Sequence, residues 1–454
     1  MKKLSMEIVN VHAAGIDVGS RFHMVAVNQS TSEVKQFGVY TEDHQHMIVY
    51  LKDHGITSIA MESTGSYWQT LFSALQTAGF EVLLVNGQQT QNIKGKKTDV
   101  QDCVWIQKLH SLGLLSGSFL PGQYSEKLRT YYNHRLYLVE QTSRYINKMQ
   151  KALRLMNIRL DVVLNDITGK SGRAIMEAII GGQRDPQSLA SLTNIRVKKS
   201  KEEIAKSLEG NWREDLLFEV KECLSLYDIY EAKIRRCDEQ LNQVLKSIEH
   251  GQDVTAELSK PLCKKQRTKH SPGFDVSTLA YMHFKVDLFA IPGLSYNTGL
   301  CLLTNLRRED IEKFPTVKNF TSWLRLAPNN KKTGGKIISS RTPKGKNKIA
   351  LALRQVANCI GSMKKHPLLS FFKRVAYKKG RAAAITATAR KLGVIIYHMI
   401  TKQRDYQLID NETFNEKIKI QKMKNVKRQL EKLSLSSQQL ETLFQSLSLS
   451  TANL

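Results

Sequence analysis

Four acidic residues stand at positions from which a fold could bring their side chains together. Asp17 and Glu62 each end a short apolar stretch of the kind that forms a buried strand. Asp99 and Asp102 are three residues apart in a stretch that enters a helix, so both would lie on one helical face. Each acid also has an ordinary explanation, since Asp before Gly is common in turns and acids in a first helical turn suit the helix dipole. The chemistry therefore depends on whether the four converge.

Four carboxylates at one edge of a sheet would bind two divalent cations about 4 Å apart, an arrangement suited to in-line displacement at phosphorus. Hard oxygen ligands favour Mg²⁺ or Mn²⁺ as those cations. Without a metal ion, the clustered acids would repel one another and raise one another's pKa. Asp17, Glu62, Asp99 and Asp102 are thus the candidate metal ligands and catalytic residues of a site that cuts phosphodiesters.

Residues 1–120 have the pattern of a scaffold that could position these acids. Three strands followed by alternating helices and strands match the order of an α/β RNase H-like sheet. In such a sheet, the positions of the four acids face one another across one edge. The expected strands are 14–17, 23–28, 33–40, 58–62 and 81–86, and the expected helices are 42–54, 68–78 and one that follows Thr98 as its N-cap.

A second chemical feature is the polar stretch 327–336, which contains two glycines and three lysines and is followed by Ser339 and Ser340. A hydroxyl flanked by flexible backbone and cations is what a nucleophile that attacks a phosphodiester needs. A loop that clamps phosphate and has no covalent role is the alternative. The expected nucleic-acid-binding residues are Lys331, Lys332, Lys336, Arg341, Lys344, Lys346 and Lys348.

The net charge of +27 is concentrated in one segment. Residues 313–404 contain 22 Lys and Arg and no Asp or Glu. A polyanionic partner is the natural interpretation, because each cation that neutralises a phosphate releases counterions, and a merely soluble basic surface is the alternative.

No apolar run reaches the length of a membrane span, so no membrane partner is expected. Six scattered cysteines without a Cys-x-x-Cys pair, together with no secretory signal, predict reduced thiols in the cytoplasm.

From Tyr132 the pattern changes to two long amphipathic stretches. Each keeps its stripe at steps of four and three for about four heptads, which is typical of coiled-coil helices. A turn region at 181–186 separates them, so we expect a long helical hairpin or helices that pair between subunits. The first stripe is Tyr132, Leu136, Val139, Ser143, Ile146, Met149, Leu153, Met156, Leu160 and Val163, and the second is Leu216, Val220, Cys223, Tyr227, Tyr230, Ile234, Cys237, Leu241, Val244 and Ile248.

The C-terminal part begins with residues 251–286, whose weak periodicity and basic cluster indicate a linker. Residues 291–295, Ile-Pro-Gly-Leu-Ser, predict either a helix-hairpin-helix turn, in which backbone N–H groups hold a DNA phosphate, or an ordinary Pro-Gly turn. A helix is expected at 349–360. The lysine-rich tail after residue 401 contains one helical stretch, at 414–433.

With these motifs, the sequence resembles the DEDD transposases of insertion-sequence family 110 over about residues 12–400. The matching pieces are Gly15-Ile16-Asp17-Val18, Met61-Glu62-Ser63-Thr64-Gly65, Lys97-Thr98-Asp99-Val100-Gln101-Asp102, Ile291-Pro292-Gly293-Leu294 and the run from Leu326 to Lys336. The resemblance implies that DNA strands are cut and exchanged between donor and target. It further implies a structured guide RNA, a homo-oligomer (dimer or tetramer), a bacterial cytoplasmic, nucleoid-associated location, and a hydroxyl nucleophile in the C-terminal domain.

The domains expected on this basis are a RuvC-like nuclease domain at 1–125, a coiled-coil region at 126–250, a linker at 251–286, a mostly α-helical transposase domain at 287–400 and a basic tail at 401–454.

One position departs from the family pattern, because Thr333 stands where the family usually has serine. Threonine keeps the hydroxyl, adds a methyl group and stiffens χ1.

Three interpretations of this threonine follow. Thr333 is the nucleophile, Ser339 or Ser340 serves instead, or the copy is catalytically weakened and only binds nucleic acid. Two other classes of enzyme remain. A RuvC-like junction endonuclease would cut with metal-activated water and would not need Thr333. A sugar-kinase or actin-like ATPase also reads Ile-Asp-x-Gly-Ser in its first phosphate loop, although this chain lacks a second Asp-x-Gly loop and is strongly basic.

Overall fold

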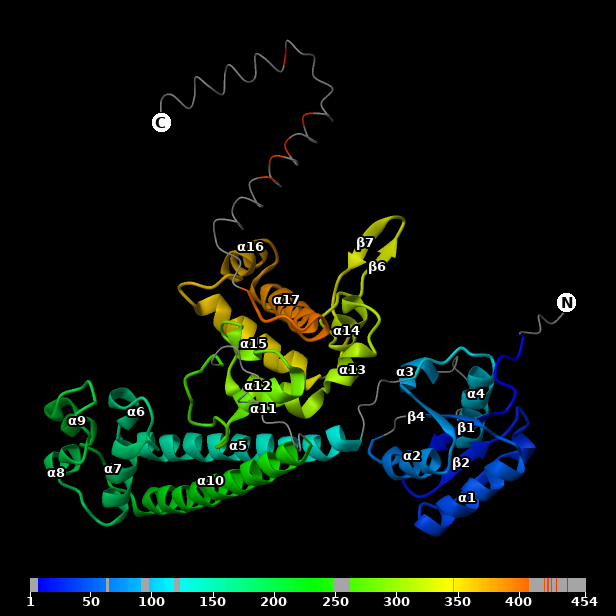
Figure 1. Ribbon diagram of the computed structural model, residues 1–454. Helices are drawn as coiled ribbons and strands as arrows, with labels where there is room; N and C mark the ends of the chain where they lie inside the picture. The colour runs from blue at the N-terminus through cyan, green and yellow to red at the C-terminus, as the bar shows by residue number, and fades with distance from the viewer. Residues whose placement is uncertain are drawn as a thin grey trace. The chain divides into compact units, whose positions relative to one another are not determined.

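The computed structural model describes residues 7–62, 65–90, 98–117, 123–248, 262–345 and 347–407, together with a few isolated positions beyond. The chain divides into two compact units, 1–120 and 121–454, and each has its own core (Figure 1). No helix in these ranges is both long enough and apolar enough to cross a membrane.

The first unit is built on a five-stranded mixed sheet of order β3-β2-β1-β4-β5. β1 pairs antiparallel with β2, β2 pairs antiparallel with β3, and β1, β4 and β5 run parallel. The strands are β1 Ala13–Val18, β2 His23–Ala26, β3 Lys35–Phe37, β4 Ser58–Glu62 and β5 Glu81–Val85. This order is consistent with an RNase H-like fold. The third strand is shorter than predicted, because Glu33 belongs to a 3-10 turn, η1 Thr31–Glu33.

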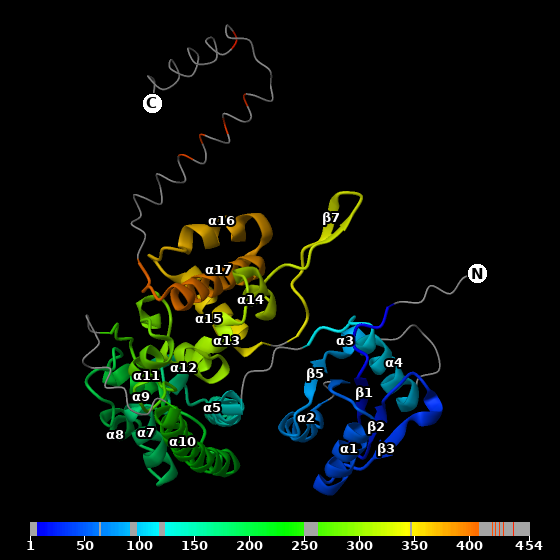
Figure 2. The same ribbon diagram turned by 45° about the vertical axis from the view of Figure 1, so that its right-hand side comes forward.

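Helices cover both faces of this sheet (Figure 2). On one face, Ile16 and Ile59 pack against buried side chains of α1 Thr41–Asp53 and α2 Trp68–Thr77. On the other face, Met24 and Ala26 of β2 pack against Cys103 of α4 Asp99–Ser111, and a short helix, α3 Gly87–Thr90, follows β5. Because successive strand residues point to opposite faces, the odd-numbered residues of β1 face α4.

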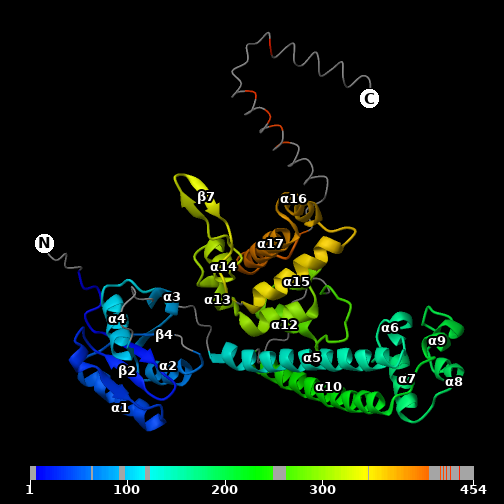
Figure 3. The ribbon, with the colours of Figure 1, turned by 180° about the vertical axis from the view of Figure 1, so that it is seen from behind.

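The second unit contains two long helices that lie side by side and run antiparallel, α5 Gln123–Leu155 and α10 Glu214–Ile248 (Figure 3). Their pairing is shown by the Cys237 thiol, which donates to the Tyr131 carbonyl at 3.2 Å, and by the stacked rings of Tyr145 and Tyr230. The intervening chain forms α6 Leu160–Val163, α7 Lys170–Ile180, α8 Pro186–Ser191 and α9 Lys201–Ser207. The two stretches therefore pair within one chain, and a supercoil stays a prediction.

The buried stripe of α10 agrees with the sequence, whereas that of α5 corrects it. Leu136 and Ser143 are exposed, and Arg135 and Thr142 take their places, with exposed fractions of 2% and 0%. The sequence pattern does not predict Arg135 to be buried, because a buried charge between two helices is unfavourable unless it is paired. In the structure it is paired, since Arg135 donates to both carboxylate oxygens of Asp238 and to the carbonyl of His270.

This buried pair predicts a large stability effect. Replacement of Arg135 by Ala is expected to destabilise the second unit by about 3–5 kcal/mol, because it leaves the Asp238 carboxylate buried without its partner. The measurement is urea unfolding of the full chain followed by circular dichroism. Arg144→Ala is the matched control on the same helix, where an exposed pair with Glu140 predicts a loss of less than about 1 kcal/mol. Equal losses in the two variants would contradict the prediction.

The remainder of the second unit is mostly helical and carries one two-stranded sheet (Figure 1). The helices are α11 Val276–Phe284, the 3-10 turn η3 Leu288–Ala290, α12 Tyr296–Asn305, α13 Arg308–Glu312, α14 Val317–Trp323, α15 Lys348–Ser362, α16 Leu369–Lys379 and α17 Arg381–Lys402. The strands are β6 Lys331–Thr333 and β7 Lys336–Ser339. The predicted helix at 349–360 is α15, and the predicted tail helix at 414–433 lies almost wholly outside the described residues.

Two sequence predictions for this part need correction. α11 lies inside 251–286, the segment expected to be a linker, and buries Val276, Leu279 and Phe284. Its side chains fill the helical core, so this part of the segment is folded, and residues 251–261 lie outside the described residues. The sequence predicts a loop over 327–336, but residues 331–336 form β6, the turn and the first residue of β7. At 291–295, Gly293 adopts a positive φ of 81° and Ser295 caps α12 through the Thr298 N–H.

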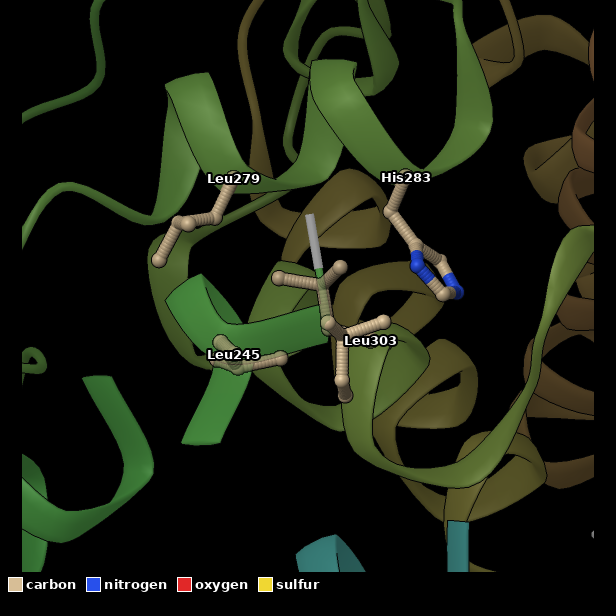
Figure 4. A pocket seen from close by; sticks show the side chains of 5 residues that line it. Leu245, Leu279, His283 and Leu303 are labelled. Carbon is tan, nitrogen blue, oxygen red and sulfur yellow. The ribbon is translucent and has the colours of Figure 1, made fainter. Parts of the chain in front are cut away.

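A small apolar hollow lies where α10 ends against α11 and α12 (Figure 4). Four of its five lining residues are Leu or Ile, and His283 is the other. The hollow has no room for a water molecule, so it is a packing gap and not a ligand site.

Candidate metal edge and basic hairpin

Asp17 and Glu62 lie at the same edge of the sheet. The parallel register of β1 and β4 runs from Ala13 opposite Ser58 to Ile16 opposite Met61. Asp17 and Glu62 are the next residues on the two strands, and adjacent strands are about 4.8 Å apart. The predicted strand ends therefore place two of the four carboxylates beside each other.

Both carboxylates belong to the face of the sheet that α4 covers. Ser58, four residues before Glu62 on β4, shares a 2.8 Å hydrogen bond with His110 of α4. Gly15, two residues before Asp17 on β1, lies directly beneath that helix, and a Cβ there would come within 2.3 Å of the Gln107 backbone nitrogen. Only glycine allows α4 to lie this close to β1, and this close approach brings the helix over the carboxylate edge.

α4 runs antiparallel to β1, so its first turn lies toward Asp17. The start of β1 is hydrogen-bonded to the C-terminal half of α4. Asn10, three residues before β1 begins, donates to the His110 carbonyl, and Gln107 donates to the carbonyl of Ala13, the first residue of β1. Near the start of the helix, burial raises the pKa of Cys103 to about 12, and the charges of Asp17 and Asp102 contribute to this shift. Both carboxylates thus lie within electrostatic reach of the same thiol.

The first turn of α4 presents the remaining pair of acids. Thr98 is the N-cap, as the sequence predicts, and its side chain accepts a hydrogen bond from the Gln101 N–H at 3.3 Å. Asp99 is exposed and Asp102 is half-buried. The basic loop before this helix, at 91–97, and residues 63–64 after β4 lie outside the described residues.

Thr90 is a residue of this edge that sequence reasoning missed. Its hydroxyl donates a 2.6 Å hydrogen bond to Oε2 of Glu62, and the hydroxyl side chain is almost completely buried. Gly87 packs against the same carboxylate, since a Cβ there would come within 2.7 Å of Oε1 of Glu62. α3 therefore orients Glu62. Thr90 and Glu62 are 28 positions apart in the sequence, and no local pattern signals this contact.

The donor set suits a hard divalent cation in its chemistry, because Asp17, Glu62, Asp99 and Asp102 offer only carboxylate oxygens. Two of them end adjacent strands, and Asp17 and Asp102 both act on the Cys103 thiol. Among the described residues, no three His, Cys, Asp or Glu side chains stand close enough together to hold a metal ion. Asp17 and Glu62 end adjacent strands on one face of the sheet, and the convergence of all four acids on a cation stays a prediction.

Thr333 lies at the tip of the β6–β7 hairpin in the second unit. It is the last residue of β6 and pairs with Lys336 across the turn. The turn residues Gly334 and Gly335 have positive φ values of 53° and 75°, which is the conformation of a two-residue type I′ hairpin turn. Thr333 is exposed, and Ser339 lies opposite Lys331 at the other end of the hairpin. Of the three candidate hydroxyls, Thr333 is the one directly before the Gly334-Gly335 turn.

The predicted nucleic-acid-binding cations fall into two groups. An exposed group lies on the hairpin and in the segment after it, and consists of Lys331, Lys332, Lys336, Arg341 and Lys344. Lys348 differs, because it is half-buried at the start of α15 and donates to the Asn133 side chain of α5. Burial also lowers the pKa of Lys348. The geometry therefore favours a structural role for Lys348, and Lys346 lies outside the described residues.

Two buried histidines lie near the end of β1 and predict a pH effect. His23 pairs with Val18, and its ring centroid lies 5.6 Å from that of His44 on α1. Burial lowers the pKa of His23 to about 4, with His44 adding to the shift and Asp43 opposing it, and burial lowers the pKa of His44 as well. Both rings are thus neutral in the folded protein at neutral pH.

The sign of the effect follows from proton binding. Unfolded histidine binds a proton below about pH 6.5, whereas folded His23 stays neutral down to about pH 4, so the unfolded state binds more protons in this window. The first unit is expected to lose about 3 kcal/mol as the pH falls from 6.5 to 4. Urea midpoints measured across this range check it. His23→Phe is expected to flatten the profile and the exposed control His46→Gln is not, and identical profiles in all three proteins would contradict the assignment.

Comparison with known protein families finds matches over the two regions that contain the carboxylate edge and the β6–β7 hairpin. Residues 14–158 match the family model of the IS110 DEDD transposases, described as a transposase. Residues 287–372 match a second model, described as a transposase of the IS116/IS110/IS902 family. No curated protein matches the chain. The first match includes all four acids and the second includes Thr333, so the two predicted chemical features fall in the two matched regions. The chain belongs to the IS110 family of DEDD transposases.

Proposed function

We propose that this transposase cuts and exchanges DNA strands with Mg²⁺ or Mn²⁺ held by Asp17, Glu62, Asp99 and Asp102. The observation that carries the proposal is the in-register placement of Asp17 and Glu62 on the face covered by α4. A bound divalent cation would neutralise charge on the phosphate that is attacked. Thr90 orients the Glu62 carboxylate, and Gly15 allows the acidic first turn of α4 to approach.

The hydroxyl of Thr333 is the proposed nucleophile of the exchange. It loses its proton as its oxygen forms an ester bond to phosphorus, and the deoxyribose oxygen leaves and takes up a proton. A hydroxyl on the incoming strand then reverses these steps and rejoins the DNA. One phosphodiester replaces another, so the exchange needs no external source of energy. The exposed position of Thr333 beside the Gly334-Gly335 turn supports this role.

The proposed partners follow from the family and from the charge. Donor and target DNA are the substrates, and a structured RNA would select them in a homo-oligomer, either a dimer or a tetramer. The 22 cations of residues 313–404, without an intervening acid, support binding to phosphates. The proposed location is the bacterial cytoplasm, in association with the nucleoid.

A junction endonuclease is the second candidate, and the threonine at position 333 is the observation that favours it. Such an enzyme would cut with water activated by the metal ion and would not rejoin strands. Strand exchange between labelled donor and target DNA, assayed with purified protein and its RNA, separates the two. Exchange that proceeds equally with Mg²⁺ and with EDTA would contradict the proposed function.

The hairpin lysines predict a change in salt dependence. For duplex DNA, log affinity falls linearly with log salt, and each phosphate contact contributes about 0.9 to the steepness of that fall. Simultaneous replacement of Lys331, Lys332 and Lys336 by Gln is expected to make the fall less steep by about 3. Fluorescence anisotropy between 50 mM and 300 mM salt measures the slope. The control replaces Lys199, Lys206 and Lys221, three lysines outside the acid-free segment, by Gln. Slopes that fall equally in the two triple variants would contradict a specific role for the hairpin.

A further inference from the structure

The basic helices α16 and α17 hold two cations over one aromatic ring. The helices lie side by side and are joined at Gly380, which has a positive φ of 82° (Figures 1 and 2). The Lys391 ammonium on α17 lies 4.1 Å from the centroid of the Phe371 ring on α16. The Arg374 guanidinium lies 5.7 Å from the same centroid. Phe371 therefore brings the positive charges of the two helices together.

These two cations have no carboxylate partner in the part of the chain that the structure describes. Residues 313–404 contain no Asp or Glu, and no ion pair of Arg374 or Lys391 occurs among the described residues. Burial lowers the pKa of Lys391, and the neighbouring charge of Arg374 lowers it further. Arg381 differs, because its guanidinium donates to Asn358 and Ser362. Arg374 and Lys391 thus repel each other at a place where an anion would relieve the repulsion.

An exposed aromatic ring follows Arg374 on α16. Tyr377 is 93% exposed, three residues after Arg374 and four after Lys373, so it follows both on the same side of α16. A tyrosine that buries almost none of its ring against its own protein offers both faces to a partner. A flat ring next to cations is the arrangement on which unpaired bases stack.

We propose that α16 and α17 form a binding site for single-stranded nucleic acid, with a phosphate between Arg374 and Lys391 and an unpaired base stacked on Tyr377. The inference rests on the proposed function for the presence of nucleic acid, and it adds the surface and the unpaired state of the ligand. A duplex would satisfy the two cations but would leave the ring without a base, because paired bases are stacked on one another. An unpaired segment of RNA and a DNA strand opened for exchange share this chemistry.

The test is the affinity of the full-length protein for fluorescent oligothymidine and oligouridine, with a DNA duplex as a third ligand. Tyr377→Ala is expected to weaken binding of a single strand about 10-fold, whereas Tyr377→Phe keeps the aromatic face and retains affinity. For single strands, Arg374→Gln and Lys391→Gln are each expected to make the fall of log affinity with log salt less steep by about 0.7. Tyr137→Ala, at an exposed tyrosine of α5, is the matched control and is expected to bind as the wild type does.

The outcomes separate this inference from the proposed function. Weakening confined to oligouridine identifies RNA as the ligand, and weakening confined to oligothymidine identifies DNA. Unchanged affinity of Tyr377→Ala for both strands, while the wild type binds them, overturns the site and leaves the proposed function standing. A wild-type protein that binds no nucleic acid overturns both.

Discussion

Asp17→Asn is expected to lower the rate of strand exchange by about 10³-fold or more while leaving DNA affinity nearly unchanged. The substitution keeps the shape of the side chain at the end of β1 and removes the negative charge that would hold a divalent cation. Asp17 lies beside Glu62 at the sheet edge, so its loss removes one of the two strand-borne ligands. A 10³-fold loss corresponds to about 4 kcal/mol of transition-state stabilisation. Single-turnover exchange at saturating Mg²⁺ measures the rate, and anisotropy measures DNA affinity.

The matched control for this prediction is Asp53→Asn. Asp53 is an exposed carboxylate at the end of α1, the helix that covers the opposite face of the sheet. It carries the same charge in the same unit but does not lie at the proposed metal edge. Wild-type exchange in Asp17→Asn would contradict the metal-ligand assignment. An equal loss in both variants would indicate that net charge in the first unit, and not the position of the acid, controls the rate.

The carboxylate edge was partly predictable because it depends on local patterns. Apolar stretches that end in Asp17 and Glu62 indicate strand ends, and the spacing of Asp99 and Asp102 indicates one helical face. All these elements are present in the structure. What the pattern could not show is long-range: the antiparallel course of α4 over Gly15, and the hydrogen bond from Thr90 that orients Glu62. Such contacts join residues with no sequence signal in common.

The errors in the second unit have specific physical causes. The sequence pattern predicts the wrong buried stripe for α5. A buried arginine is unfavourable unless it is paired, and Arg135 is paired only by Asp238 and the His270 carbonyl, which lie in distant segments. The hairpin was expected to be a loop because Lys331–Thr333 is wholly polar and exposed, so neither burial nor alternation marks it as a strand. Its formation follows from the two positive-φ glycines, which fix the turn and thereby the register of the flanking residues.

Thr333→Ala is expected to abolish strand exchange, and Thr333→Ser is expected to support exchange at least as fast as the wild type. Alanine removes the hydroxyl that forms the proposed ester to phosphorus, whereas serine keeps it and removes the methyl group that restricts χ1. Ser339→Ala and Ser340→Ala are the controls on the same hairpin and its exit, and they are expected to exchange strands normally. Single-turnover assays of each variant, with denaturing gels that reveal protein covalently joined to DNA, measure both exchange and the ester.

The pattern across these four variants assigns the chemistry. Loss of both exchange and the covalent adduct in Thr333→Ala alone identifies Thr333 as the nucleophile. Loss in Ser339→Ala or Ser340→Ala, with normal Thr333→Ala, moves the nucleophile along β7 and its exit. Cleavage without rejoining that is equal in all four variants and still requires Mg²⁺ indicates attack by water, because such a reaction depends on the carboxylate edge and not on any hairpin hydroxyl. Thr333→Ala therefore distinguishes a transposase, which needs the hydroxyl, from a junction endonuclease with the same carboxylate edge, which does not.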